Sequence, residues 1–369
     1  MDSDFEIFLV APPGLEPHLA AEARAAGFDG VTEQAGGVAL RGGWAEAMRA
    51  NLDLRGAVRV LVRFASFRAM HLAQLDKRAR KVDWSAILRP DVPVKVEAVC
   101  RASRIYHHKA AAQRIARAIT ETLGAPLAED ASVRILARID DDLCTLSIDT
   151  TGDPLHKRGH KEFVGKAPLR ENMAAMFLAE CGFDGSQPVV DPMCGSGTFV
   201  LEAAEIAAGL QPGRSRTFAF EQLALFDPAA LAALRRPAPD RTPEPRFLGF
   251  DRDQGAIRGA AANAARAGLS AWCRFACQPL SALERPDGPP GLVMINPPYG
   301  ARIGERKQLF GLYGALGTVL KERFRGWRVG IVTSDAGLAK ATALPFLEPG
   351  PQVAHGGLKV QLWRTAPLP

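Results

Sequence analysis

From about residue 165 onward, short apolar stretches alternate with alanine-rich stretches of helical length. This pattern limits the possible folds of the second half of the chain more than any other feature. The strand-like stretches are 188–191, 246–250, 292–295 and 329–333. The helix-like stretches between them are 198–208, 254–267 and 307–324. Alternation of this kind predicts a doubly wound, mostly parallel α/β sheet. A proline-rich interruption at 211–245 predicts an excursion from the sheet, with one helix near 228–235.

The first 150 residues mix the two patterns less regularly. Their strand-like stretches are 5–11, 58–64, 92–100, 133–139 and 143–148. Their helix-like stretches are 15–26, 45–52, 71–81 and 107–123. Such mixing predicts a small α+β region. The turn-rich string TTGDP at 150–154 separates it from the second half, and 369 residues accommodate two or three domains.

Positive charge is concentrated in one part of the chain. The sequence has 46 Lys and Arg against 40 Asp and Glu, a formal charge of +6, but residues 55–117 contain 15 Lys and Arg against only four acids. On a helical wheel, the stretch 107–123 is apolar on one side, and its other side carries Lys109, Gln113, Arg114 and Arg117. The pattern fits an ordinary solvated helix face, and it also fits a surface that binds nucleic-acid phosphates.

A glycine-rich string, DPMCGSGT at 191–198, follows a predicted strand and opens a predicted helix. Gly195 and Gly197 allow the backbone to approach a ligand closely, and the helix start offers free N–H groups. The string has neither the Gly-Lys-Ser/Thr of a P-loop nor the spacing of the dinucleotide fingerprint. It therefore favours a ligand that carries a carboxylate, although a simple tight turn would also explain it.

Two acidic residues end the next predicted strand, in the string GFDRD at 249–253. A carboxylate at this place in a doubly wound sheet can accept hydrogen bonds from both hydroxyls of a ribose, and Asp251 is the natural candidate. We expect Asp253 to cap the following helix instead.

The string NPPY at 296–299 is the most informative one in the chain. A strand at 292–295 places Asn296 at its carboxyl end, and the two prolines fix the backbone so that a carbonyl points into the site. An amide oxygen beside a backbone carbonyl provides two acceptors, which is what a planar amino group with two N–H bonds requires. The ring of Tyr299 can stack on the base that carries the amino group.

In this order, the glycine-rich loop, the acidic strand end and NPPY resemble the class I S-adenosylmethionine-dependent amino-methyltransferases. The strings LHKRGH at 155–160, APLRENMAA at 167–175 and FAFE at 218–221 are more specifically similar to the THUMP-domain RNA guanine-N2 methyltransferases, in particular the bacterial branch that acts on 23S ribosomal RNA. PGLE at 13–16 and SRIYH at 103–107 are similar to the N-terminal region of that family. The resemblance covers nearly the whole chain.

The resemblance implies a three-part architecture. A ferredoxin-like subdomain at 1–55 and a THUMP RNA-binding domain at 56–152 form an α+β region. Residues 153–369 then form a linker and a Rossmann-like class I methyltransferase domain with a mostly parallel sheet and a final antiparallel strand at 358–363.

The resemblance also implies roles for individual residues. The cofactor S-adenosylmethionine would be bound by Asn172, Asp191, Pro192, Cys194, Gly195, Gly197, Thr198, Asp251, Arg252 and Gln278. Related sequences usually have an Asp at the adenine contact where this chain has Pro279, so Gln278 is taken as the substitute. From the concentration of positive charge, we expect RNA to be bound by Arg101, Arg104, His107, Lys109, Arg114, Arg117, Lys157 and Arg158.

The implied reaction is methyl transfer from S-adenosylmethionine to the exocyclic N2 of a guanosine, with 23S rRNA as the substrate. The catalytic residues would be Asn296, Pro297, Pro298 and Tyr299. The alternatives are a tRNA guanine-N2 methyltransferase, a DNA adenine-N6 methyltransferase, a protein glutamine-N5 methyltransferase and a non-catalytic RNA-binding factor. The basic first half argues against a protein substrate, and the THUMP resemblance argues against DNA.

Neither a metal site nor a membrane segment is predicted. The six cysteines are scattered, which favours reduced thiols. His156 and His160 lack a third ligand nearby, so we expect them to contribute positive charge. The N-terminal residues are acidic and no apolar run reaches membrane length, which predicts a cytoplasmic protein.

Overall fold

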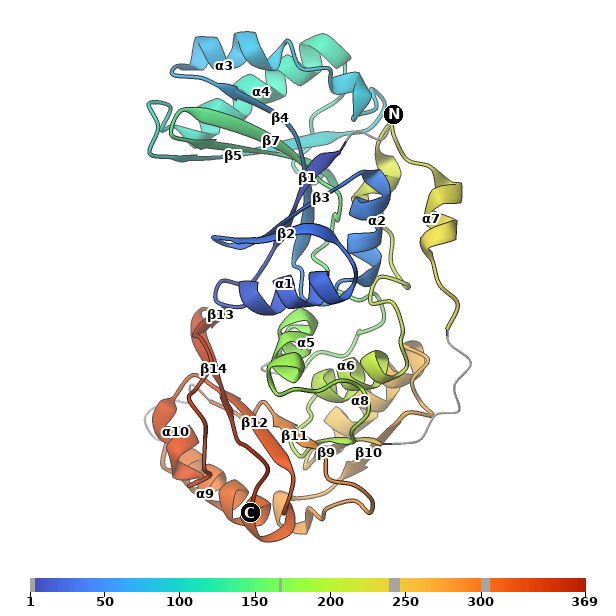
Figure 1. Ribbon diagram of the computed structural model, residues 1–369, viewed down its shortest axis with the longest axis vertical. Helices are drawn as coiled ribbons and strands as arrows, with labels where there is room; N and C mark the ends of the chain where they lie inside the picture. The colour runs from blue at the N-terminus through green and yellow to red at the C-terminus, as the bar shows by residue number, and fades with distance from the viewer. Residues whose placement is uncertain (1–3, 166–167, 239–245, 300–305) are drawn as a thin grey trace. The chain divides into compact units, whose positions relative to one another are not determined.

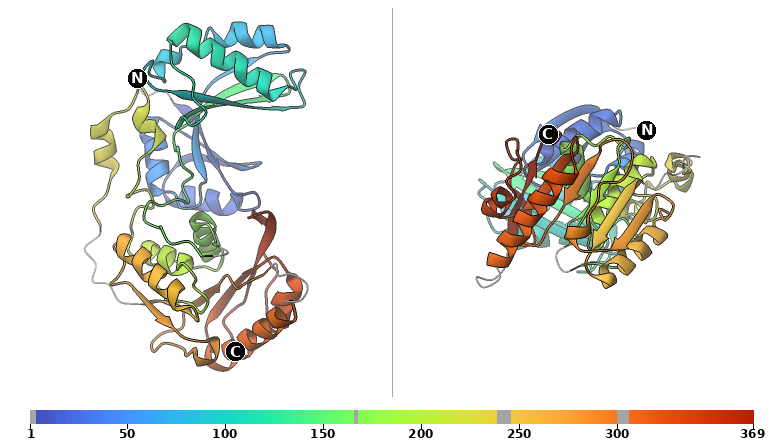
Figure 2. Two further views of the ribbon diagram at one scale, coloured as in Figure 1. Left: turned by 180° about the vertical axis from the view of Figure 1, so that it is seen from behind. Right: turned by 90° about the horizontal axis from the view of Figure 1, so that it is seen from below.

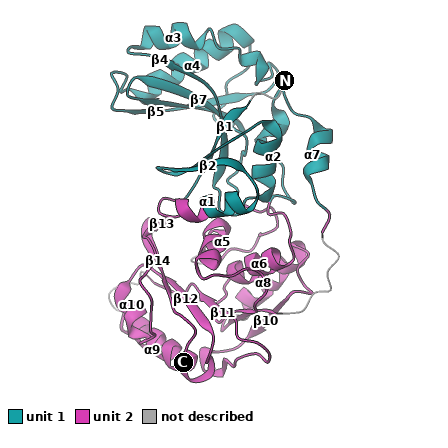
Figure 3. Ribbon diagram, viewed as in Figure 1, with its two compact units in different colours: residues 1–11, 20–155, 213–236 teal, residues 12–19, 156–212, 237–369 magenta. Residues whose placement is uncertain are grey.

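The computed structural model describes residues 4–165, 168–238, 246–299 and 306–369. They form two compact units, each with its own sheet (Figures 1 and 3). The first unit contains residues 1–11, 20–155 and 213–236, and the second contains residues 12–19, 156–212 and 237–369.

The sheet of the first unit has the strand order β2-β3-β1-β4-β7-β6-β5 within the described residues. Its strands are β1 (Phe5–Val10), β2 (Asp29–Gln34), β3 (Gly37–Gly42), β4 (Arg59–Arg68), β5 (Val94–Arg101), β6 (Val133–Asp140) and β7 (Leu143–Asp149). β5 and β6 are parallel, and the other neighbours are antiparallel.

Strand β4 is shared by the two halves of this sheet. Arg59–Arg63 pair with β1 on one side, and Leu61–Arg68 pair with β7 on the other, with a break in register between Arg63 and Ala65. The predicted ferredoxin-like and THUMP regions are therefore joined through one continuous sheet.

The helices of the first unit cover its sheet unevenly. They are α2 (Trp44–Asp53), α3 (Leu72–Ala79), α4 (His108–Leu123), α7 (Pro228–Leu234) and the short η1 (Trp84–Ala86) and η2 (Ala219–Gln222), together with residues 20–25 of α1 (Glu16–Ala25), whose first residues are counted in the second unit. Helices α3 and α4 lie against each other on one face of the β4–β7 half (Figures 1 and 2). The wheel prediction for α4 is confirmed, because Ala111 and Ile115 are fully buried whereas Lys109, Arg114 and Arg117 are exposed.

The segment 213–236 comes from the second half of the sequence but packs in the first unit. The N–H of Gly213 donates to the carbonyl of Leu52 at 3.0 Å, and the N–H of Phe220 donates to that of Thr150 at 3.0 Å. Helix α7 packs against α2. The sequence correctly predicted an excursion from the second sheet with a helix at 228–235, and the structure packs this segment in the first unit.

The second sheet has the order β10-β9-β8-β11-β12-β14-β13 within the described residues. Its strands are β8 (Val189–Asp191), β9 (Phe247–Asp251), β10 (Cys273–Cys277), β11 (Leu292–Ile295), β12 (Arg328–Thr333), β13 (Val353–His355) and β14 (Leu358–Arg364). The first five strands are parallel, whereas β14 runs antiparallel to both β12 and β13. The predicted Rossmann-like sheet with a final antiparallel strand is confirmed.

The helices of the second unit connect these strands and bury their apolar sides. They are α5 (Glu171–Glu180), α6 (Thr198–Ala207), α8 (Gln254–Arg266), α9 (Arg306–Arg323), α10 (Ala336–Ala341) and the short η3 (Leu280–Ala282). A core cluster around β8, β11 and β12 contains fully buried Ile295, Tyr313, Phe324 and Trp327. In the part of the chain that the structure describes, no helix is long and apolar enough to span a membrane.

Candidate active site

Three neighbouring parallel strands deliver the predicted site residues to one edge of the second sheet. Strand β8 lies between β9 and β11, with Asp191 in register with Gly249 and Val190 in register with Val293. Asp191, Asp251 and Asn296 therefore all lie at the carboxyl ends of adjacent strands, which is where doubly wound sheets bind ligands.

Asp191 is a buried carboxylate. Its side chain is 2% exposed, and its Oδ1 accepts the N–H of Met193 at 3.0 Å. Burial raises the pKa of Asp191 to about 8, and the charge of Asp251 acts in the same direction. A positively charged group bound beside Asp191 would favour its ionised form, because it would compensate for the lost hydration.

The glycine-rich loop turns tightly between β8 and α6. Gly195 and Gly197 have φ angles of +52° and +84°, which side chains disfavour. A Cβ at Gly197 would meet Ala260 and Phe275 at 3.2–3.3 Å, whereas a Cβ at Gly195 would meet nothing within 4 Å. The loop therefore leaves open space above Gly195, and a side chain there would project into it.

The other residues predicted to bind the cofactor near this loop are buried. Pro192 and Cys194 are buried, and the N–H of Cys194 donates to the carbonyl of Phe250 at 2.9 Å. Thr198 opens α6 and is 7% exposed. Asn172, the second residue of α5, is fully buried.

Asp251 links the ends of β8 and β9. Its Oδ2 accepts the N–H of Gly195 at 3.0 Å, and its Oδ1 accepts the N–H of Asp253 at 2.9 Å. Asp253 caps α8 by accepting the N–H groups of Gly255 and Ala256, so its predicted capping role is confirmed. The half-buried Asp251 keeps lone pairs on both oxygens for further donors.

Strand β10 ends beside Asp251. The N–H of Gln278 donates to the carbonyl of Asp251 at 3.0 Å, and Gln278 itself is half-buried. Arg252 and Pro279 are exposed. The structure thus places the backbone of Gln278 next to the acidic strand end.

Asn296 follows β11 directly and begins the NPPY turn. Pro297 is buried, Pro298 is exposed, and Tyr299 is half-buried against the core cluster. The buried phenol of Tyr313 on α9 donates to the carbonyl of Pro298 at 3.4 Å. Tyr313 was not singled out in the sequence, and this contact helps to fix the turn that carries the two predicted acceptors.

The segment 156–165 packs on the same domain through ionic contacts. The Lys161 Nζ lies 2.8 Å from the Glu171 carboxylate and 2.8 Å from the Thr198 hydroxyl, so it bridges the starts of α5 and α6. Asn263 donates to the carbonyls of Phe163 at 3.0 Å and Ser196 at 3.2 Å. These residues, which sequence reasoning missed, connect the segment to the glycine-rich loop.

Two predictions for this segment are wrong. Arg158 was assigned to RNA binding, but its side chain is 1% exposed, and its Nε donates to Glu202 at 2.9 Å. His156 was expected to add positive charge, but burial and the nearby Arg170 lower its pKa to about 4, so it is neutral near pH 7. A signal was present in the sequence, since two acids, Glu202 and Glu205, interrupt an otherwise apolar helix and require basic partners.

The remaining predicted RNA-binding residues lie at the surface. Those with exposed side chains are Arg101, Arg104, His107, Lys109, Arg114, Arg117 and Lys157. His107 also caps α4, because its Nδ1 accepts the N–H of Ala110 at 3.3 Å. Tyr106 beside it is 82% exposed, which excludes it from the core.

Comparison with known proteins identifies the family. A model of the RMKL-like methyltransferase domain matches residues 158–348, which is more than half of the chain. The chain belongs to the RMKL-like methyltransferase domain family. Models of the RlmL ferredoxin-like domain and of the THUMP domain match residues 6–61 and 69–149. These matches confirm the predicted family and architecture of an S-adenosylmethionine-dependent methyltransferase with a THUMP domain.

Relatives of this family cover the chain to different extents. A putative RNA methyltransferase of Synechocystis is 31% identical over 366 residues, covering 96% of this chain and 95% of its own. The ribosomal RNA large subunit methyltransferase K/L of Syntrophotalea carbinolica is 37% identical over 360 residues, which cover 92% of this chain but 50% of that protein. The chain therefore spans about half the length of the K/L relatives it matches.

Solved structures share the whole fold. A possible methylase from Clostridium difficile matches with a TM-score of 0.89 at 26% identity, covering 100% of this chain and 99% of its own. A putative methyltransferase complexed with S-adenosylhomocysteine (SAH) matches with a TM-score of 0.88 at 27% identity, covering 100% of both chains.

Proposed function

We propose that this chain transfers a methyl group from S-adenosylmethionine to the exocyclic N2 of a guanosine in 23S ribosomal RNA. The observation that carries the proposal is the NPPY turn at the end of β11, next to the strand ends of Asp191 and Asp251. The relatives named ribosomal RNA large subunit methyltransferases and the THUMP match support an RNA substrate.

The residues around the glycine-rich loop fit S-adenosylmethionine. The open space above Gly195 admits the amino-acid part of the cofactor. Burial raises the pKa of Asp191, because the ionised carboxylate has lost its hydration. A bound ammonium group beside it would stabilise this ionised form. Asp251 can accept two ribose hydroxyls with its remaining lone pairs. The cofactor supplies a methyl group activated by a positively charged sulfur.

The NPPY turn fits a planar amino group as the acceptor. The guanine N2 is a poor nucleophile because its lone pair is delocalised into the ring. We infer that the Asn296 amide oxygen and the Pro297 carbonyl accept its two N–H bonds, direct the lone pair at the methyl carbon and stabilise the positive charge that develops on nitrogen. A bound cofactor would supply the methyl group to this nitrogen as its own C–S bond breaks, and one N–H proton would then leave to solvent. Tyr299 stacks on the base, which must first leave its helical stack.

The Asn296→Ala variant tests this assignment. Loss of one acceptor that orients the reacting nitrogen should lower turnover by about two to three orders of magnitude, as for other preorganised polar groups that contact reacting atoms. Binding of S-adenosylmethionine, measured by calorimetry, should be unchanged. Tyr299→Phe keeps the stacking ring and should keep most of the activity, whereas Tyr299→Ala should not. Unchanged turnover of Asn296→Ala would contradict the assignment.

Two other nucleic-acid substrates present a similar amino group. One solved structure at 28% identity and a TM-score of 0.88 is titled a predicted N6-adenine-specific DNA methylase from Listeria monocytogenes, and tRNA guanosines are the other alternative. The purified full chain should be incubated with tritiated S-adenosylmethionine and, separately, with unmodified 23S rRNA, tRNA and DNA. The proposal expects label in 23S rRNA as 2-methylguanosine. Label in tRNA or DNA alone would replace it with the corresponding alternative.

A further inference from the structure

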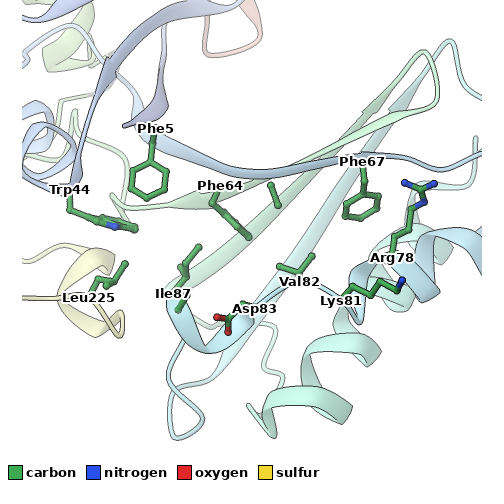
Figure 4. A pocket seen from close by; sticks show the side chains of 12 residues that line it. Phe5, Trp44, Phe64, Phe67, Arg78, Lys81, Val82, Asp83, Ile87 and Leu225 are labelled. Carbon is green, nitrogen blue, oxygen red and sulfur yellow. The ribbon is translucent and has the colours of Figure 1, made fainter. Parts of the chain in front are cut away.

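A hollow of about 690 Å³ opens on the first unit, and none of the residues assigned above lines it. Its walls come from β1, β4, the start of α2, the end of α3 with the following residues 81–87, and the segment 213–236 (Figure 4). All of these elements belong to the same compact unit. The volume lies in the range of pockets that hold small organic groups.

Aromatic rings form the inner wall of the hollow. Phe5, Phe64 and Phe67 project into it from the sheet, and Trp44 closes one end (Figure 4). All four side chains are half-buried. The Phe5 and Trp44 rings meet edge to face at 5.7 Å, and Phe64 meets the buried Trp84 in the same way at 5.9 Å. The rings are therefore held in place without filling the space between them.

A break in strand pairing brings two of these rings to one side of the sheet. Along a regular strand, Phe64 and Phe67 would point to opposite faces, because side chains alternate. The register of β4 against β7 shifts between Arg63 and Ala65, so one extra residue reverses the alternation at this point. Phe64 and Phe67 consequently line the same hollow.

The other end of the hollow is positively charged. Arg78 and Lys81 lie there beside Phe67, at the end of α3 (Figure 4). Both are exposed, and among the described residues neither forms an ion pair. By contrast, the neighbouring Arg80 is paired with Asp76 and Glu121. Of the described residues that line the hollow, Asp83 is the one acid, and it accepts the hydroxyl of Ser85 at 2.6 Å.

We propose that this hollow binds an unstacked nucleotide of the RNA substrate, with the base against Phe64 and Phe67 and a phosphate between Arg78 and Lys81. Flat rings beside unpaired cations match a base joined to a phosphate. Aromatic rings are not required to bind an aliphatic peptide. An acidic peptide would pair with the cations but would not stack on the flat faces of the rings. The proposal rests on RNA being the substrate, and it adds a contact apart from the methylated guanosine.

The direct test uses the full chain and a fluorescein-labelled oligouridylate that carries one 4-thiouridine. Irradiation should cross-link the thiouridine to the peptide containing Phe64 and Phe67. In fluorescence anisotropy, the double variant Phe64→Leu, Phe67→Leu should bind about tenfold more weakly, because leucine fills the space but does not stack on a base. The double variant Arg78→Glu, Lys81→Glu should bind more weakly and with a flatter salt dependence.

Phe8→Leu is the matched control. Phe8 is a half-buried phenylalanine of β1 that alternation places on the opposite face of the sheet, where Arg63 lies 4.4 Å from its ring. Its substitution should leave RNA affinity unchanged, and thermal melting should show that all variants fold.

The possible outcomes separate this proposal from the proposed function. If the unmodified chain binds and methylates RNA but the Phe64, Phe67 variant binds it equally well, the hollow is not an RNA site and the enzymatic assignment stands. If free uridine monophosphate or an acidic peptide saturates the hollow and RNA does not, the occupant is another ligand. If the unmodified chain does not bind RNA, both proposals are wrong.

Discussion

Two basic segments of this protein look alike in sequence and differ completely in structure. In helix α4 of the first unit, Arg114 and Arg117 are exposed. In the segment that enters the second unit, Arg158 is fully buried against Glu202, and Lys161 is paired with Glu171. The sequence predicts RNA binding for both segments. The difference shows that the role of a basic segment depends on the residues it packs against.

The helix faces that receive these segments explain the contrast. Helix α6 is apolar except for Glu202 and Glu205, which are both buried and would be costly without cations. Arg158 supplies a cation to Glu202, and the Nε2 of His160 lies 3.5 Å from the carboxylate of Glu205. Around α4, Glu121 pairs with Arg80 and Arg117, but Arg114 forms no ion pair among the described residues. The first unit therefore keeps cations available at its surface.

The largest expected effect tests the buried pair. Arg158→Met leaves Glu202 buried without its cation and should lower the free energy of unfolding of the second unit by about 3–5 kcal/mol, measured by urea denaturation. The double variant Arg158→Met, Glu202→Leu should recover most of this loss, because it removes both charges. Binding of RNA at the surface of the first unit should not change. A large loss of RNA affinity in the well-folded double variant would restore Arg158 to the RNA-binding set.

The exposed segment should behave in the opposite way. The double variant Arg114→Glu, Arg117→Glu should weaken RNA binding about tenfold or more at low salt. The slope of log affinity against log salt concentration should become shallower by the amount expected for the loss of about two phosphate contacts. The free energy of unfolding of this variant should change by no more than about 0.5 kcal/mol, since exposed pairs contribute little. Lys321→Glu, Arg325→Glu in the second unit gives the same change of net charge at exposed positions and serves as the control. Equal loss of affinity in both variants would mean that only total charge matters.

A smaller effect distinguishes the cofactor site from the RNA-binding surface. Cofactor binding should depend on pH, whereas RNA binding should depend on salt. Asp191 must be ionised to hold the cofactor ammonium, and its pKa is about 8 in the unliganded protein. Cofactor affinity should therefore rise several-fold between pH 6.5 and 8 as Asp191 ionises, and fall again at higher pH as the ligand's own amino group, with a pKa of about 8, loses its proton. Calorimetry of the Asp191→Asn variant should show weaker binding without this rise. A flat profile for the unmodified chain would contradict the role of Asp191.

The sequence predicted β8, β9, β11, β12 and β14 of the second sheet because these strands are short, apolar and mostly bounded by chemically distinctive turns, whereas β10 and β13 were not predicted. The glycine-rich loop, Asp251 and NPPY each occupy the predicted place at a strand end. Other elements lacked such a signal. Strand β2 is exposed along most of its length, so it shows no apolar alternation, and the β2–β3 hairpin was missed.

The contacts that position the site were the least predictable. Lys161, Asn263 and Tyr313 act across large separations in sequence, and each is an ordinary residue in its local context. The docking of residues 213–236 on the first unit depends on backbone hydrogen bonds to Leu52 and Thr150, which have no sequence signature. The hollow likewise depends on a local break in strand register that composition does not reveal.

The most direct test of the central proposal is nucleoside mass spectrometry of RNA from a strain that lacks this gene. Ribosomal and transfer RNA should be digested, compared with those of the parent strain, and the changed nucleoside mapped to its position. The proposal predicts the loss of one 2-methylguanosine from 23S rRNA, restored by the unmodified gene and not by Asn296→Ala. Intact 23S methylation, or a loss confined to tRNA, would contradict it.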